Sequence, residues 1–318
     1  MSTSGTATFN FNRNQIILAA MRKIKVISSG ETPSAQLVQD FSDQLNTFAK
    51  SLDATGLHLW TEAEATLFLQ SNQISYSLGG STDNATETYT ATTLSAAAAS
   101  GAGTISVTSA TGIVTAYNIG IVLDSGSIFW TTVNGAPSGT TVTLAAVTTG
   151  SAAAGNAVYV YQSRIVRPLR VLSARRYNFV SAIDTQMMVY SRIDYRNQPN
   201  KTSTGTITQW FYDPRGGANS TGTIFVWPAP PDATNALKFT WMRPIQDFLT
   251  SANNPDLPQE WLDPLVWNLA YRMATEYPVP RALYEMVKEQ AILTLQNVMG
   301  FDREPESYLF GFNADQTR

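Results

Sequence analysis

One histidine, His58, and no cysteine occur among the 318 residues. Disulfides, thiolate metal sites and cysteine nucleophiles are therefore excluded, and one histidine cannot supply two imidazole ligands to a metal ion. A catalytic histidine needs an oriented nucleophile and a third group, and no Gly-x-Ser-x-Gly elbow accompanies His58. We interpret His58 as a structural or surface residue, and we predict neither a metal site nor a cofactor.

Acidic residues are the other candidates for catalysis, and they fall in three groups: Glu62 with Glu64, Glu285 with Glu289, and Asp302 with Glu304 and Glu306. Glycoside hydrolysis needs two carboxyl groups across a cleft, one of them kept protonated by burial. The first group lies on a polar stretch, the second on the solvated face of a predicted helix, and the third near the C-terminus. We interpret all three as solvated charges and predict that the chain is not an enzyme.

A strip of arginines is the one conspicuous cluster of charge: Arg164, Arg167, Arg170, Arg175 and Arg176. Arginine binds nucleic-acid phosphate without regard to base sequence, which would suit contact with DNA. Its planar guanidinium equally suits ion pairs between subunits. Because Lys+Arg (21) and Asp+Glu (24) nearly balance, for a net charge of −3, we favour pairing over DNA contact.

The C-terminal segment 301–318 carries the clearest sign of an interface, a group of large apolar side chains: Tyr308, Leu309, Phe310 and Phe312. Gly311 interrupts any helical stripe, whereas in an extended chain Tyr308, Phe310 and Phe312 share one face. Three exposed aromatic rings favour aggregation, so we expect this arm to dock on a partner or on the chain's own core.

The composition is poor in charge. Charged residues make up 14% of the chain, against roughly 25% in soluble domains. Hydrophobic residues make up 43%, which is ample for packed cores and argues against disorder. Low charge weakens self-repulsion and suits a protein whose flanks are covered by neighbours. The N-terminal residues show no signal peptide, and no run of 18 apolar residues predicts a membrane helix.

The elements that must position these residues are helices at both ends of the chain. Periodic apolar residues predict helices over 12–29, 32–56, 261–277 and 281–298. Thr32 is the expected N-cap of the second helix, with Pro33 at its first position. The first two helices are joined by a short turn, so we expect them to pack as an antiparallel hairpin.

Short β-prone runs separated by glycine-rich turns fill the middle of the chain. Six of these runs, rich in Thr, Ala and Val, are expected strands: 88–94, 104–107, 119–123, 128–133, 141–144 and 157–161. Bulkier runs follow at 206–212, 223–227 and 237–242. The predicted fold class is α+β, a helical bundle from the N- and C-terminal helices with β-sheet elements and an inserted small β-sandwich or barrel. The expected domains are an adaptor-like core (1–79 plus 163–300), the insertion (80–162) and the arm (301–318).

The order of several short segments resembles the head-to-tail adaptor, or tail accessory factor, family of short-tailed bacteriophages. The first is Ser-Gly-Glu-Thr-Pro between the two N-terminal helices, followed by Leu-Asp-Ala-Thr-Gly-Leu-His-Leu-Trp. The others are Arg-Pro, Asp-Tyr, Phe-Val-Trp-Pro-Ala-Pro, Leu-Pro-Gln-Glu-Trp and Leu-Ala-Tyr-Arg-Met. They lie at 29–33, 52–60, 167–168, 194–195, 225–230, 257–261 and 269–273. The large β portion departs from the smallest members of that family, which are mainly helical.

The resemblance implies a structural virion protein at the neck or tail, made in the cytoplasm of the host bacterium. It implies a ring of twelve subunits that binds beneath the portal protein, continues the DNA channel and carries tail nozzle or tail fibre proteins. Non-specific contact with genomic DNA in the channel is expected, and contact with a membrane is not. Two alternatives remain open: a virion-associated cell-wall hydrolase, and a receptor-binding or capsid-decorating β protein.

Overall fold

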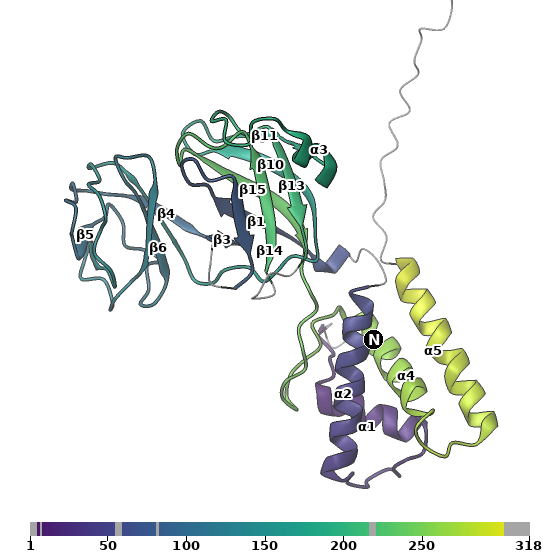
Figure 1. Cartoon of the computed structure of the whole chain (residues 1–318). Helices are drawn as coiled ribbons and strands as arrows, with labels where there is room; N and C mark the ends of the chain where they lie inside the picture. Colours follow the sequence, from purple (N-terminus) through teal and green to yellow (C-terminus); the bar gives the residue numbers. More distant parts are fainter. Residues whose placement is uncertain (1–4, 7, 55–58, 81–82, 216–220, 302–318) are drawn as a thin grey trace, which may run out of the picture. The chain divides into compact units, whose positions relative to one another are not determined.

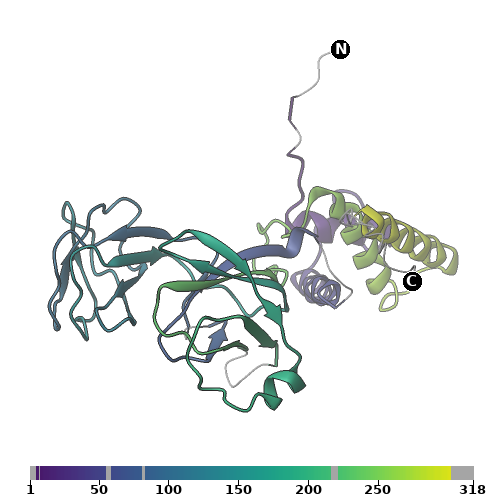
Figure 2. The ribbon, with the colours of Figure 1, turned by 90° about the horizontal axis from the view of Figure 1, so that it is seen from above.

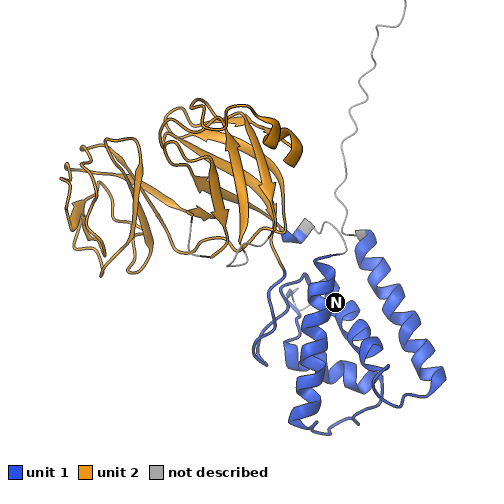
Figure 3. Cartoon of the chain, viewed as in Figure 1, with its two compact units in different colours: residues 1–61, 245–318 blue, residues 62–244 orange. Residues whose placement is uncertain are grey.

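The computed structural model describes residues 5–6, 8–54, 59–80, 83–215 and 221–301. The chain divides into two compact units (Figure 3): Met1–Thr61 with Ile245–Arg318, and Glu62–Pro244. The first unit is helical and joins the two ends of the chain. The second contains the β-strands.

The helical unit contains α1 (Arg13–Lys23), α2 (Ala35–Leu52), α4 (Leu262–Met273) and α5 (Arg281–Phe301), with short 3₁₀ turns η1 (Leu59–Thr61) and η2 (Gln259–Trp261). Helix α1 begins with a capping box, in which the Asn12 side chain accepts the Gln15 N–H and the Gln15 side chain accepts the Asn12 N–H. It ends earlier than predicted because Lys25 adopts a left-handed backbone (φ 59°). The N-cap of α2 is Ser34, whose hydroxyl accepts the Leu37 N–H at 3.2 Å, and not the expected Thr32.

One apolar core holds these helices together. Ile17 of α1, Leu45 of α2 and Leu269 of α4 are fully buried in it, and Val287 brings α5 onto the same core. Asn268, also buried, donates from Nδ2 to the carbonyl oxygens of Pro264 and Ala291, which ties α4 to α5. Segments from the two ends of the sequence therefore complete one core.

The β unit forms two lobes, which both views of the ribbon separate (Figures 1 and 2). The larger lobe contains a five-stranded sheet in the order β11-β10-β15-β1-β3 and a four-stranded sheet in the order β12-β13-β14-β2. Its strands are β1 (Glu62–Phe68), β2 (Ser75–Leu78), β3 (Ala85–Thr86), β10 (Arg170–Asn178), β11 (Ile183–Gln186), β12 (Met188–Val189), β13 (Gln209–Asp213), β14 (Gly222–Trp227) and β15 (Asn235–Met242), with the helix α3 (Arg192–Asn197). Side chains of both sheets, Phe239 and Trp241 from one and Trp210 and Ile224 from the other, share a single core.

The smaller lobe contains a sheet in the order β4-β9-β6-β7 and a two-stranded sheet of β5 and β8. Its strands are β4 (Thr90–Thr93), β5 (Thr104–Ser106), β6 (Asn118–Val122), β7 (Ile128–Thr132), β8 (Thr141–Thr143) and β9 (Ala157–Tyr161). Each of the six β-prone runs predicted from the sequence coincides with one of them to within a few residues, so that prediction is confirmed. The lobe buries its own core of small aliphatic side chains, among them Val107, Ile119 and Val158.

An aromatic cluster joins the two lobes. Phe68, at the end of β1, is 1% exposed and lies among rings of the smaller lobe, with ring centroids 4.9 Å from Tyr159, 5.1 Å from Trp130 and 5.2 Å from Tyr89. Trp130 also lies over Gly120 of the neighbouring strand β6, where a Cβ would come within 2.6 Å of the indole ring. A glycine is therefore required at this position for the ring to pack as it does.

The predicted fold class is wrong. Within the described residues four sheets make up most of the structure, only five α-helices occur, and one of these belongs to the β unit. The physical reason is that residues 62–244 bury three of the four apolar cores by themselves. They form the main body of the chain, whereas the prediction treated them as elements carried by a bundle.

The division into units also differs from the predicted grouping of segments. Residues 62–79 and 163–244 belong to the β unit, whereas the prediction placed them with the helices. The pairing of β1 with β15 over seven residues is responsible, since it joins a strand near the N-terminus to one far along the chain. A separate inserted domain at 80–162 stays a prediction.

Candidate functional site

The residues first considered for catalysis do not meet at one place in the described part of the chain. Glu64 pairs with Arg175, and Glu285 lies 3.7 Å from Lys288 on α5. His58 and the acidic group Asp302, Glu304 and Glu306 lie outside the described residues. No group of three or more side chains that could hold a metal ion is found among the residues that the structure describes.

The five arginines of the predicted strip do not share a common partner. Arg164 donates to the buried Asn84 (3.0 Å), Arg167 to the carbonyl oxygen of Pro214 (3.0 Å), and Arg176 to the Thr185 hydroxyl (3.3 Å). Arg175 forms an ion pair with Glu64. The remaining member, Arg170, is exposed and has no hydrogen-bond or ion-pair partner among the described residues. Four of the five guanidinium groups are thus engaged by the chain's own groups.

On the outer face of the five-stranded sheet, two pairs of opposite charges each span an intervening strand. Arg175 of β10 reaches across β15 to Glu64 of β1, while Lys238 of β15 reaches across β10 toward Asp184 of β11 at 3.9 Å. The Lys238 ammonium also lies 3.5 Å from the ring centroid of Tyr177, a cation–π contact. This face is electrically balanced, so it is not a basic surface for DNA.

The four residues of the predicted arm, Tyr308, Leu309, Phe310 and Phe312, lie outside the described residues. Their role remains a prediction from the sequence.

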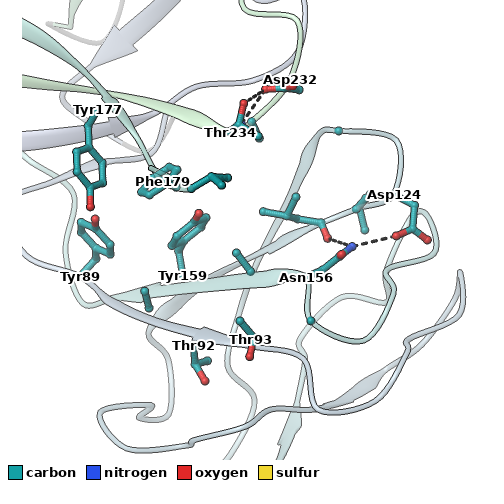
Figure 4. A pocket seen from close by; sticks show the side chains of 18 residues that line it. Tyr89, Thr92, Thr93, Asp124, Asn156, Tyr159, Tyr177, Phe179, Asp232 and Thr234 are labelled. Carbon is teal, nitrogen blue, oxygen red and sulfur yellow. Dashed lines mark hydrogen bonds between the residues drawn. The ribbon is translucent and has the colours of Figure 1, made fainter. Parts of the chain in front are cut away.

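A cavity of about 790 Å³ lies between the two lobes of the β unit (Figure 4). Rings line one side of it: Tyr89, Tyr159, Tyr177 and Phe179. Figure 4 shows the hydroxyls of Tyr89 and Tyr177 pointing toward one another, with Asp124 and Asn156 at the opposite end. The strands β4, β9 and β10 carry or flank the rings, whereas the turn between β6 and β7 carries Asp124.

The carboxylate of Asp124 in the cavity is occupied by hydrogen bonds from nearby residues. Asp124 accepts hydrogen bonds from the Ala153 N–H, the Ser151 hydroxyl and the Asn156 amide, and these hold the pKa of its carboxyl below the ordinary value. Burial raises the pKa of the Tyr159 hydroxyl. A general acid or base works best with a pKa near the working pH, and both shifts move away from neutrality. The cavity is therefore better suited to packing or binding than to proton transfer.

Sequence reasoning missed a surface that the structure exposes. Five large apolar side chains within fourteen residues are 59–83% exposed: Val180, Ile183, Met188, Val189 and Ile193. Ile183 lies in β11 and Met188 and Val189 in β12, which are the outermost strands of the two sheets of the larger lobe, whereas Val180 precedes β11 and Ile193 lies in α3. We call these five residues the apolar edge strip. The sequence signal is weak: the consecutive Met187, Met188 and Val189 break the alternation of a half-buried strand.

A family model, SU10 adaptor protein, matches residues 130–300. This stretch is more than half of the chain and runs from β7, through the larger lobe, to α4 and nearly all of α5.

The chain belongs to the SU10 adaptor protein family.

The arginines 164–176, the apolar edge strip and the outer helix α5 all fall within the matched stretch, whereas α1, α2 and the arm do not. No curated protein is found to match the chain.

Membership of a bacteriophage adaptor family makes this chain a structural component of a virion. The coarser part of the predicted function, a phage structural protein, is thereby confirmed. No helix in the described part of the chain is long and apolar enough to cross a membrane.

Proposed function

We propose that the chain is the subunit of a head-to-tail adaptor ring of a short-tailed phage. In this proposal twelve copies bind beneath the portal protein, continue the DNA channel and form the platform for tail nozzle or tail fibre proteins. The observation that carries the proposal is the family match over 130–300, because it includes parts of both the β unit and the helical unit.

The exposed face of α5 supports a role in assembly. Met286, Ile292 and Leu293 are each close to half exposed, in a helix whose opposite face packs through Val287 on the helical core. Ile292 and Leu293 line a shallow depression together with the charged Glu285, Lys288 and Glu289. An apolar helix face bordered by charged residues is typical of a surface that a partner covers.

The low charge of the chain supports the same proposal. With a net charge of −3, copies repel one another weakly when they are brought side by side. The exposed Arg170 is the member of the arginine strip best placed to reach a neighbouring subunit or the DNA, since the others are engaged by their own chain. The arm holds the chain to a neighbouring subunit or to the portal.

The test is assembly with the portal protein of the same phage. Native mass spectrometry of the chain alone should show the 34.7 kDa monomer, and addition of portal rings should give a portal–adaptor complex with a single adaptor count. Electron microscopy of that complex should place the adaptor ring coaxial with the portal. A chain that does not bind the portal, or that forms a stable closed ring without it at micromolar concentration, would contradict the proposal.

Paired variants of the arm sharpen the test. Replacement of Tyr308, Phe310 and Phe312 by Ser should weaken attachment, because burial of each aromatic ring contributes roughly 1.5–3 kcal/mol before ordering costs. The matched control replaces Asp302, Glu304 and Glu306 by Ser, three changes in the same segment that remove no apolar surface. Equal loss of assembly by the two variants would show that the rings are not what holds the complex.

A further inference from the structure

Successive backbone N–H groups along the apolar edge strip form hydrogen bonds to two different sheets. Met187 donates its N–H to the Ala174 carbonyl of β10, in the five-stranded sheet. Met188 and Tyr190 donate theirs to Thr208 and Trp210, beside and in the four-stranded sheet. Because successive amides of an extended chain point in opposite directions, the Val189 N–H points away from the four-stranded sheet. Since β11 and β12 each end the strand order of their sheet, one side of each has no neighbouring strand among the described residues, and the strip lies where the chain passes from one sheet to the other.

No proline and only paired charges stand at this edge between residues 180 and 193. Exposed edge strands are commonly blocked by charged side chains or proline, because an open edge accepts another strand. Here Asp184 of β11 is paired with Lys238 of β15 at 3.9 Å, and Arg192 of α3 donates to Asp213 of β13 at 2.8 Å, so both charges are partly neutralised. Large apolar side chains stay at the surface, with Val189 63% and Met188 64% exposed, although polar residues such as Thr185 and Gln186 are exposed beside them. A strand with apolar side chains is the partner that such an edge fits.

We propose that the apolar edge strip binds, as an added strand, the C-terminal arm 302–318 of a neighbouring copy of the chain. The arm has the required pattern, since Tyr308, Phe310 and Phe312 alternate with Leu309 and Gly311 and contain no proline. Added strands gain affinity from backbone hydrogen bonds and specificity from alternate side chains. Seventeen extended residues span up to about 56 Å, enough to reach from one subunit to the next.

The proposed ring favours a contact between different copies of the chain. A ring needs two different surfaces on each subunit, so that each copy gives one and accepts the other. Pairing of one strip with another strip would use the same surface twice and stop at a dimer. The arm of one copy and the apolar edge strip of the next copy provide these two surfaces. This step rests on the proposed ring, whereas the binding of arm to strip can be measured without the portal.

The experiment uses the full chain with Tyr308, Phe310 and Phe312 changed to Ser, so that its own arm cannot occupy the strip. A fluorescent peptide of residues 301–318 is titrated into it, and binding is followed by anisotropy. Saturable binding is expected. Val189→Lys should weaken it at least tenfold, and Val147→Lys, a matched change at a similarly exposed valine (56%) of the smaller lobe, should not. A peptide with Ser at 308, 310 and 312 should not bind.

A second measurement needs no change in the strip. Hydrogen exchange of residues 183–190 should slow when the peptide is added to the same host, because the open amides gain partners. No binding, equal weakening by Val189→Lys and Val147→Lys, or protection elsewhere would overturn the proposal. The proposal would also be overturned if the unaltered monomeric chain did not bind the peptide, because its strip would then be occupied by its own arm.

The two proposals fail separately. A portal-bound ring whose chains do not bind the peptide would retain the adaptor function and remove the arm-to-strip contact. A chain that binds the peptide at the strip but never binds the portal would retain the arm-to-strip contact and remove the adaptor function.

Discussion

Removal of the Phe68 ring should loosen the joint between the two lobes of the β unit. Phe68 is 1% exposed and contacts five other rings, with centroid distances of 4.9–6.3 Å: Tyr89, Trp130, Tyr159, Tyr161 and Phe179. Phe68→Ala deletes the side chain at the centre of this cluster. The cores of the two lobes are built from other residues, so each lobe keeps its own packing.

The magnitude follows from burial and from ring contacts. Truncation of a buried Phe to Ala costs about 3–5 kcal/mol, and each aromatic pair is worth about 0.5–1.5 kcal/mol beyond the area it buries. Since five pairs are lost together, we expect the upper part of that range, about 4–5 kcal/mol. For a unit of this size, 1 kcal/mol lowers the midpoint of thermal unfolding by about 2–4 °C, so the midpoint should fall by about 8–20 °C.

Differential scanning calorimetry with far-ultraviolet circular dichroism is the assay. The transition of the β unit should move, while that of the helical unit should stay, because Phe68 contributes nothing to the helical core. The matched control is Phe9→Ala, at an exposed phenylalanine, for which a change within about 0.5 kcal/mol is expected. A loss below about 1.5 kcal/mol for Phe68→Ala would refute the reasoning, since it would mean that the cluster closes over the gap or does not hold the lobes.

Two further predictions concern the β unit. Gly120→Ala should lower the free energy of unfolding by about 1–3 kcal/mol, because the new methyl group meets the Trp130 ring, whereas Gly103→Ala, where the nearest atom is 3.8 Å away, should not; urea unfolding of both variants checks this. A hydrogen bond from Arg215 lowers the pKa of Asp213 from 3.8 to about 2. The ionised Asp213 therefore stabilises the folded chain above about pH 4, and this contribution is lost as the pH falls toward 2. The difference in free energy of unfolding between the unaltered chain and Asp213→Asn should shrink over that interval, and a constant difference would count against the assignment.

Local structure was predicted well from the sequence. The six β-prone runs between 88 and 161 each overlap a strand, and the four predicted helices exist with ends shifted by a few residues. These features depend on neighbours along the chain, such as apolar periodicity and turn residues. The prediction of Thr32 as N-cap was wrong: Ser34 suits a cap equally well, and the position of the first helical turn makes Ser34 the cap.

The fold class failed at the level of strand pairing. Neither β1 nor β15 carries a signal that names its partner, yet they pair in register from Glu62 with Met242 to Phe68 with Ala236. Because no partner strand is visible in the sequence, the prediction grouped residues up to 79 with the N-terminal helices. The share of the fold that the β unit forms depends on its separate apolar cores, which only the tertiary structure defines.

The arginine strip shows the same limit for a candidate site. Spacing along the sequence placed five arginines within thirteen residues, but Arg175 and Arg176 lie on opposite faces of β10 and bind Glu64 and Thr185. Whether an arginine is available to a partner depends on which acceptors the sheet brings near it. Only Arg170 is left without such a partner in the described part of the chain.

By itself, the sequence determined the absence of cysteine chemistry, the low charge, the local helices and strands and the order of segments that points to phage adaptors. The tertiary structure alone decided that the β-strands form the main body, that the rings around Phe68 join two lobes, and that β11 and β12 leave an open apolar edge. The reason is that composition and periodicity act over a few residues, whereas pairing, burial and exposure arise between residues far apart in the chain. Val189 of β12 and Val226 of β14 are the same residue type in one four-stranded sheet, and only the fold buries Val226 and exposes Val189.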